Sequence, residues 1–134
     1  MLIEAATMLA AISLGVRLLP FRRLAALAQT RVRGRPPADP LATILRVAWA
    51  VRAVARRARF RAVCIEQGLV AHLMLRRRGI GSTLFYGVAR RDGELKAHVW
   101  VRWGEIDVIG CEIADEFTLV AQFPAAQTRD SALS

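Results

Sequence analysis

The feature of this sequence that most constrains its fold is a change in hydrophobic period close to Gly79. Before that glycine, apolar residues recur every three or four positions, which is the spacing of helices. After it, β-branched and aromatic residues alternate with polar ones in short runs, which is the pattern of strands. Helices followed by antiparallel strands predict an α+β fold in which a helix packs on a small sheet.

Three helical segments are expected, the first as one helix or two: residues 2–29, 41–57 and 63–78. The stretch "RVRGRPPADP", with one glycine and three prolines, separates the first two. Asp39 and Pro40 at its end supply a cap and a first-turn proline for the second helix. A short link at about 58–62 leads to the third helix, whose arginine-rich end is expected to be a solvated terminus.

The strands are expected over residues 82–89, 96–103, 105–110 and 117–123. In the second strand His98 alternates with Val99, which places the two side chains on opposite faces. The whole is expected to be one domain over residues 1–124, with a helical part at about 1–57. The polar residues 125–134 are expected to form a flexible tail.

Composition narrows the class of protein. The 134 residues are 54% hydrophobic and 23% charged, which is typical of a globular domain. Two cysteines exclude a disulfide scaffold and fit a reducing cytoplasm, and with only two histidines a zinc site is not expected. We therefore predict a cytoplasmic protein with no metal and no other cofactor.

The formal net charge of +9 is unevenly distributed. Residues 1–91 contain seventeen basic and three acidic side chains, whereas residues 92–134 contain three basic and eight acidic ones. Aromatic side chains do not alternate with the arginines as a base-stacking surface requires, so no nucleic-acid partner is expected. A basic face beside an acidic one favours docking to charged proteins or peptides.

The apolar N-terminus, "MLIEAATMLAAISLGVRLLP", is expected to be a buried helix. Glu4 stands where a signal peptide carries basic residues. The uncharged run from Ala5 to Val16 is shorter than the roughly 20 residues that span a bilayer. The basic end of this segment leaves open a weak peripheral association with the inner membrane.

Cys64 and His98 have the positions that a cysteine hydrolase needs. Cys64 falls in the first turn of its helix, where N–H groups and the helix dipole stabilise a thiolate and an oxyanion. A strand histidine such as His98 can take the thiol proton. The alternative is that both side chains only pack. Cys111 is interpreted as a core residue, and His72 as a surface or interface residue.

Three stretches carry a resemblance to a known family: "CIEQGLVAHLMLRRRGI", "LFYGVARRDGELKAHVWVRW" and "VIGCEIADEFTLVAQFP". Together with "LLPFRRLA" and "VAWAVRAVARR" they resemble the leader peptidases of lasso peptide biosynthesis, which are small transglutaminase-like proteins. The similarity extends to about Pro124. It implies a transglutaminase-like, papain-like cysteine protease core with Cys64 as the nucleophile and His98 as the base.

The family also has an acid that orients the histidine, and here Glu105, Asp107 and Glu112 are the choices. Asp107 shares a face with His98 but is expected opposite Arg102, four residues along the strand. Glu112 is nearer the level of His98 and would face it only across a three-residue turn or a bulge. Asp107 is ranked first, because an aspartate is the usual member, and Glu112 second.

The resemblance implies that this bacterial protein cuts the leader from a ribosomally made precursor peptide. A separate recognition protein would deliver the leader, and an ATP-using cyclase would then close the ring of the core peptide. The segment before residue 41 leaves no room for a recognition domain, so the chain is expected to be the stand-alone peptidase. Two other functions stay open: a non-catalytic adaptor that binds a peptide or partner, and an accessory protein at the membrane surface.

Overall fold

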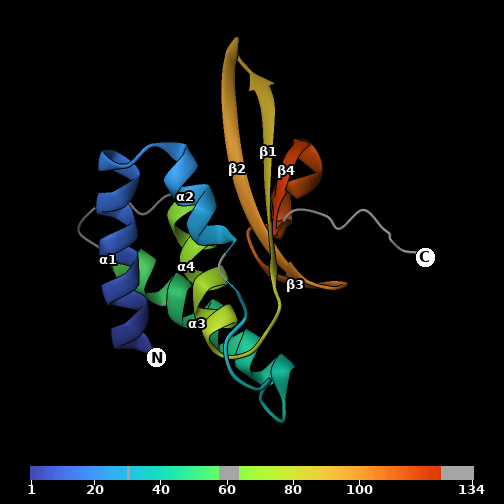
Figure 1. Ribbon diagram of the computed structural model, residues 1–134. Helices are drawn as coiled ribbons and strands as arrows, with labels where there is room; N and C mark the ends of the chain where they lie inside the picture. The colour runs from blue at the N-terminus through green and yellow to red at the C-terminus, as the bar shows by residue number, and fades with distance from the viewer. Residues whose placement is uncertain (30, 58–63, 125–134) are drawn as a thin grey trace.

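The computed structural model describes residues 1–29, 31–57 and 64–124 (Figure 1). In chain order its elements are α1 (Leu2–Leu18), α2 (Phe21–Ala28), α3 (Pro40–Arg57), α4 (Cys64–Arg77), β1 (Thr83–Arg91), β2 (Glu94–Trp103), β3 (Ile106–Ile109), the 3₁₀ helix η1 (Cys111–Glu116) and β4 (Thr118–Phe123). The predicted α+β class is confirmed. The link expected at 58–62 and the tail expected at 125–134 lie outside the described residues.

Helix boundaries follow the turn chemistry of the sequence. α1 ends at Leu18 and α2 begins directly after Pro20, so the first predicted segment is two helices. α3 begins at Pro40, and the carboxylate of Asp39 accepts a hydrogen bond from the N–H of Ala42 at 3.1 Å. The cap predicted for this helix is confirmed.

Helix α1 buries only one of its faces. Ala5 and Leu9 are fully buried, whereas Ile3, Leu14 and Leu18 are exposed. The prediction of a buried N-terminal helix is therefore wrong for the outer face, because the helix lies at the surface of the bundle. None of the helices in the described ranges is long and apolar enough to cross a membrane.

The four strands form one antiparallel sheet in the order β3-β2-β1-β4. β1 and β2 pair over their whole length, from Thr83 opposite Arg102 to Arg91 opposite Glu94. The two outer strands are shorter, so the far end of this hairpin extends beyond them (Figure 1). After β3 the chain passes through η1 to reach β4 at the opposite edge of the sheet.

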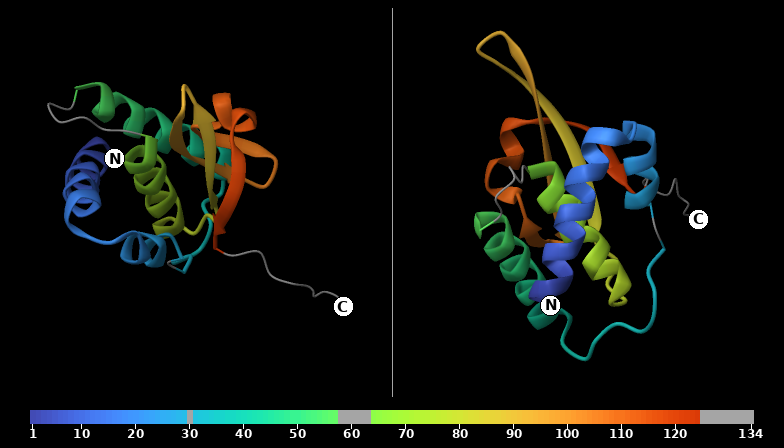
Figure 2. Two further views of the ribbon diagram at one scale, coloured as in Figure 1. Left: turned by 90° about the horizontal axis from the view of Figure 1, so that it is seen from above. Right: turned by 90° about the vertical axis from the view of Figure 1, so that its left-hand side faces the viewer.

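Helix α4 lies at the centre of the molecule, between the other helices and the sheet (Figure 2, left). One face of β2 packs against it, and Val99 and Val101 on that face are buried. Gly68 makes this contact close, because a Cβ at its position would lie 2.6 Å from Cγ1 of Val99. The absent side chain allows the helix to lie directly on the strand that carries His98.

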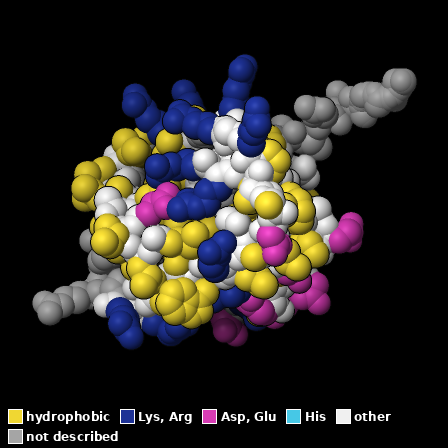
Figure 3. All heavy atoms as spheres, turned by 90° about the horizontal axis from the view of Figure 1, so that it is seen from below, with side chains coloured by type: hydrophobic (Ala, Val, Ile, Leu, Met, Phe, Trp, Pro, Cys, Tyr) yellow, Lys and Arg dark blue, Asp and Glu magenta, His cyan; other side chains and the backbone are white. Residues whose placement is uncertain are grey.

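The uneven charge of the sequence is also visible on the surface. On the face seen from below Figure 1, Lys and Arg side chains are interspersed with hydrophobic ones (Figure 3). Most acidic side chains of that face gather at the right, which is the side of the sheet. The expected contrast between a basic helical half and an acidic sheet end is therefore present on this face.

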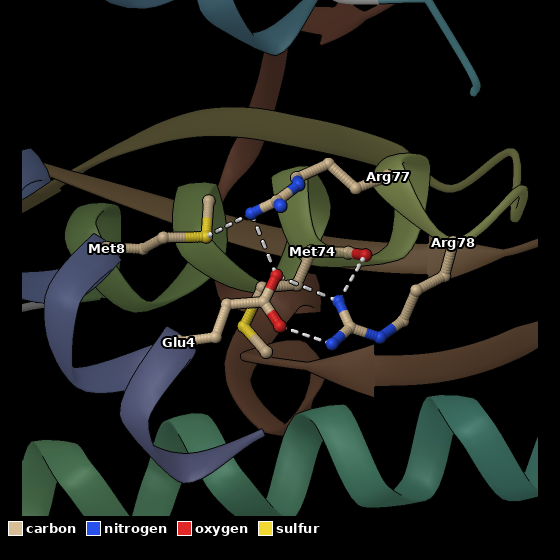
Figure 4. A network of polar contacts seen from close by, with 5 residues as sticks. All are labelled: Glu4, Met8, Met74, Arg77 and Arg78. Atoms are coloured by element: carbon tan, nitrogen blue, oxygen red, sulfur yellow. Dashed lines mark hydrogen bonds and ion pairs between the residues drawn. The ribbon is translucent and has the colours of Figure 1, made fainter. Parts of the chain in front are cut away.

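The sequence predicted that the arginines at the end of α4 form a solvated terminus, and this prediction is wrong. Arg77 and Arg78 both bind the carboxylate of Glu4 in α1, with Nη1 to Oε2 distances of 2.9 and 3.0 Å (Figure 4). Arg76 is buried, and its Nη1 donates to the carbonyl oxygen of Ser82 at 2.8 Å. These side chains hold the end of α4 against α1 and against the segment that enters β1.

The Glu4→Gln substitution should lower the free energy of unfolding by about 1–2 kcal/mol at neutral pH, since the three hydrogen bonds that Arg77 and Arg78 donate to Glu4 lose the charge of their acceptor. The hydrogen bond from Arg78 lowers the pKa of Glu4 below its ordinary value of 4.5. The advantage of the wild-type protein is therefore present above about pH 4.5 and disappears as the pH falls further.

Urea denaturation of both proteins at several pH values measures this difference. Glu94→Gln is the matched control, because the side chain of Glu94 is 70% exposed and pairs with Lys96 at 2.8 Å. An exposed pair of this kind should contribute less than about 0.5 kcal/mol. Equal losses from the two substitutions would contradict the assigned role of Glu4.

His72 is a core residue, and the prediction that it lies at the surface or an interface is wrong. Its Nε2–H donates to the carbonyl oxygen of Ala28 at 2.7 Å, and its Nδ1 accepts from the hydroxyl of Ser82 at 2.8 Å. Burial lowers the pKa of His72 to about 4, although the bond to Ala28 acts in the opposite direction. The neutral ring therefore joins α4 to the end of α2 and to the chain before β1. The flank of α4 that carries it is covered by those segments.

Acid should destabilise the fold through His72. Because its pKa is about 4 in the folded protein against an ordinary 6.5, the unfolded chain binds the proton more strongly. The free energy of unfolding should fall by up to about 3 kcal/mol from this residue as the pH falls across that interval.

Urea titrations at several pH values measure the loss, and NMR should show the His72 ring titrating near pH 4. The His72→Gln variant should lose most of the dependence, whereas His98→Gln should retain it. A His72 ring signal that titrates at the ordinary value would show that the ring is not sealed in the core.

Candidate active site

Cys64 and His98 line the same cavity, which has a volume of about 190 Å³. It lies at the edge of β2, beyond the ladder with β3 that covers Val101 to Trp103. Its walls come from α3, α4, β2, the end of β3 and the start of η1, and the lining residues are Arg52, Cys64, Gln67, Gly68, His98, Val99, Ile109, Gly110 and Glu112. The fold therefore brings together the two residues that the sequence analysis selected.

Cys64 is the first residue of α4 and is half-buried. The N–H groups of a first helical turn have no carbonyl partner within the helix, so they can hold negative charge beside the sulfur. Sγ of Cys64 lies 3.9 Å from the carbonyl oxygen of Ala97, the residue before His98. The thiol is thus placed against the backbone of the strand that carries the histidine.

His98 is held by one hydrogen bond and two aromatic contacts. Its ring stacks against Trp100 and Phe117, with centroid distances of 5.9 and 5.1 Å, and its side chain is buried. Nε2 lies 2.7 Å from the carbonyl oxygen of Gly110. A carbonyl can only accept, so Nε2 carries the proton and the neutral ring keeps its lone pair on Nδ1. This tautomer is ready to act as a base through Nδ1.

The carbonyl of Gly110 is the group that the sequence analysis missed. Gly110 adopts a left-handed conformation with φ of 77° where the chain leaves β3 and enters η1. A Cβ there would lie 2.7 Å from the carbonyl oxygen of Val99, so a larger residue would displace the turn. The glycine after "DVI" is a visible turn signal, but residue types alone do not reveal a backbone acceptor.

The two acids proposed for orienting His98 have different surroundings. Asp107 lies opposite Arg102, as expected, and binds its Nε at 3.0 Å. The register shifts between Val101 and Arg102, which is the bulge that was considered for Glu112. Glu112 lines the cavity with His98 and pairs with Arg52 at 3.4 Å. Of the two acids, Glu112 is therefore the one that the fold brings to the cavity.

Cys111 is a half-buried residue at the start of η1 rather than the core residue that was predicted. Its Sγ lies 3.3 Å from the carbonyl oxygen of Val101. Burial raises the pKa of the Cys111 thiol, and the charge of Asp107 adds to this effect. Cys111 is therefore disfavoured as a thiolate. Across the described ranges, no group of three or more His, Cys, Asp or Glu side chains could hold a metal ion.

The chain matches one known family of proteins. A sequence model described as the transglutaminase-like superfamily matches residues 6–122. The chain belongs to the transglutaminase-like superfamily. This superfamily includes cysteine peptidases and transferases, and the match covers both Cys64 and His98. Neither the curated proteins nor the solved structures gave a match.

The transglutaminase-like fold predicted from the sequence is confirmed by this match. The finer resemblance to lasso peptide leader peptidases stays a prediction. In this transglutaminase-like protein the cysteine begins the central helix, and the histidine lies on the adjacent strand with its ring held in one tautomer.

The two cysteines of this transglutaminase-like protein should differ in reactivity. We expect iodoacetamide to alkylate Cys64 before Cys111 in the folded protein, because Cys64 lines a cavity together with His98. Cys111 should react more slowly, since burial and Asp107 raise its pKa. Peptide mass mapping after short exposures at several pH values measures both rates.

The His98→Ala variant should slow the alkylation of Cys64 and leave that of Cys111 unchanged. The Cys111→Ser variant should retain the fast reaction. A thiol at position 64 that reacts only after unfolding would show that Cys64 is a packing residue.

Proposed function

We propose that this protein is a cysteine peptidase that uses Cys64 as the nucleophile and His98 as the general base and acid. One observation carries the proposal: the two side chains line one cavity, with Cys64 at a helix start and the His98 proton held on Nε2 by Gly110. Membership of a superfamily that includes cysteine peptidases supports it.

The reaction follows from the positions of these groups. Nδ1 of His98 takes the proton of the Cys64 thiol, and the thiolate adds to the carbonyl carbon of the scissile amide. The N–H groups at the start of α4 hold the resulting oxyanion. The intermediate collapses with loss of the C–N bond, and the imidazolium of His98 gives its proton to the departing amine.

Hydrolysis of the thioester completes the cycle. His98 takes a proton from a water molecule, whose oxygen adds to the thioester carbon. The C–S bond then breaks, and the acyl fragment leaves as a carboxylic acid while the thiol is restored. Throughout, the carbonyl of Gly110 keeps the proton of Nε2 in place, which is the task of the third member in other triads.

The proposed triad has two candidates for its acid, Glu112 and Asp107. Glu112 shares the cavity with His98, whereas Asp107 is bound to Arg102 and would have to leave it to reach the histidine. We therefore favour Glu112 over the Asp107 that residue type alone had ranked first. Its carboxylate can stabilise the imidazolium by charge without displacing the carbonyl of Gly110.

The proposed substrate is the leader segment of a ribosomally made lasso precursor peptide. The resemblance of the helix from Cys64 and of the strand around His98 to leader peptidases supports this substrate. The proposed partners are a leader-recognition protein, which presents the precursor, and a macrolactam-forming cyclase, which uses the freed amino terminus. We place the reaction in the cytoplasm, where such precursors are made.

The Cys64→Ala and His98→Ala variants should each lower the rate of leader cleavage at least about a thousandfold, since either one removes the reacting pair. Mass spectrometry of the precursor, incubated with the recognition protein and each variant, measures the cleavage. Cys111→Ala is the control and should cleave at close to the wild-type rate. Circular dichroism checks that all three variants fold. Wild-type cleavage by the Cys64→Ala variant would falsify the proposal.

A non-catalytic adaptor is the second candidate, and exposed apolar side chains favour it. Ile3, Leu45 and Trp49 are 83%, 60% and 57% exposed, and exposed apolar side chains of this size are common at interaction surfaces. An adaptor would support maturation of the peptide equally well with Ala at position 64. The same cleavage assay therefore separates the two functions.

A further inference from the structure

A second cavity lies beside the candidate active site, between α3 and the segment that runs from β3 into η1. Its volume is about 280 Å³, and its lining residues are Leu45, Ala48, Trp49, Arg52, Arg56, Asp107, Val108, Ile109, Cys111 and Glu112. The two cavities share Arg52, Ile109 and Glu112, so they adjoin each other. A chain that occupies one can extend into the other once the wall between them opens.

The boundary between the two cavities is an ion pair that can open. Arg52 and Glu112 lie 3.4 Å apart, with side chains 42% and 72% exposed. Arg52 is also held by the carbonyl oxygen of Val108 at 3.4 Å. Exposed pairs of this kind contribute little to stability, so a bound peptide can separate Arg52 from Glu112 at small cost.

The α3 wall of the second cavity combines apolar area with positive charge. Leu45, Trp49, Arg52 and Arg56 follow one another at three- and four-residue spacing, which places them along one face of the helix. Leu45 and Trp49 are largely exposed. A tryptophan in such a position is the side chain most often found at the energetic centre of a binding surface.

The charges of the cavity favour an acidic ligand. Its two carboxylates, Asp107 and Glu112, are already paired with Arg102 and Arg52. Arg56 forms no ion pair with any residue that the structure describes, and its guanidinium remains as the uncompensated charge of the wall. A carboxylate entering the cavity would therefore meet an available cation, whereas an ammonium would not.

We propose that this second cavity is a substrate subsite, in which the peptide that enters the Cys64 cavity continues along α3. A large apolar side chain of the peptide packs on Trp49 and Leu45, and an Asp or Glu side chain of the same segment binds Arg56. The inference rests on the proposed peptidase function, and it adds the chemistry that the enzyme recognises beside the scissile bond. Trp49 and Arg56 are specificity-determining residues that do not take part in the chemical step.

The test measures binding to the full-length Cys64→Ala protein, so it does not depend on catalysis. A random library of peptides about twelve residues long is displayed on phage and selected on this protein, and the selected peptides are synthesised with a fluorescent label. We expect them to combine a large apolar residue with an Asp or Glu nearby. In the Cys64→Ala background, Trp49→Ala and Arg56→Glu should each raise the dissociation constant about tenfold or more.

Arg57→Glu is the matched control, because Arg57 neighbours Arg56 but does not line the second cavity. It should change the dissociation constant by less than about twofold. Replacing the acidic residue of the peptide with Lys should restore binding to the Arg56→Glu protein. Thermal unfolding of each variant checks that the exposed substitutions leave the fold intact.

Four results would overturn the inference. The selection could yield no acidic and apolar motif, or peptide binding could be indifferent to Trp49→Ala and Arg56→Glu. Alternatively, light scattering could show a dimer that Trp49→Ala abolishes, which would assign the cavity to a second copy of this chain. Cleavage that depends on Cys64 but not on Trp49 or Arg56 would disprove the subsite alone, and the proposed peptidase function would still stand.

Discussion

The close packing of α4 on β2 is the contact on which the rest of the structure depends. Gly68 has no side chain, and Val99 occupies the space that a Cβ would need. Because the helix lies directly on the strand, Cys64 comes within 3.9 Å of the carbonyl oxygen of Ala97. The same helix also contacts the three other helices. A shift of α4 would therefore both move the proposed nucleophile and disturb the core.

The two histidines show how a fold assigns different tasks to one residue type. Both are buried, and both donate through Nε2 to a backbone carbonyl: His72 to Ala28 and His98 to Gly110. In His72 the second nitrogen accepts from Ser82, so the whole ring is used for structure. In His98 the ring lies at the wall of a cavity, and the lone pair on Nδ1 is the one left for chemistry. The difference lies in the partners rather than in the degree of burial.

Charge serves packing in one part of the molecule and recognition in another. At the end of α4, Arg77 and Arg78 are bound by Glu4, so these basic side chains join two helices. Along the exposed face of α3, Arg52 and Arg56 line two adjoining cavities, one of which Cys64 also lines. A net charge of +9 is therefore a poor guide to partners until the paired arginines are separated from the others.

The local sequence pattern was sufficient to predict the helices and strands, because each of them is specified by residues close together in the chain. The cap at Asp39 and the strand alternation around His98 each depend on neighbours a few residues away. The same reasoning failed for His72, Cys111 and the arginines after Met74, since their partners come from distant segments. It ranked Asp107 above Glu112 by residue type, and the fold places Glu112 but not Asp107 at the cavity that His98 lines.

The sequence by itself determined the α+β order, the position of Cys64 at a helix start and the position of His98 on a strand. Periodicity and turn residues specify these features through local backbone preferences. Only the tertiary structure decided that the carbonyl of Gly110 holds His98, that Glu4 binds the end of α4, and that a second cavity adjoins the first. Each of these depends on the approach of segments far apart in the chain, and a backbone acceptor or a shared cavity wall has no signature in residue types.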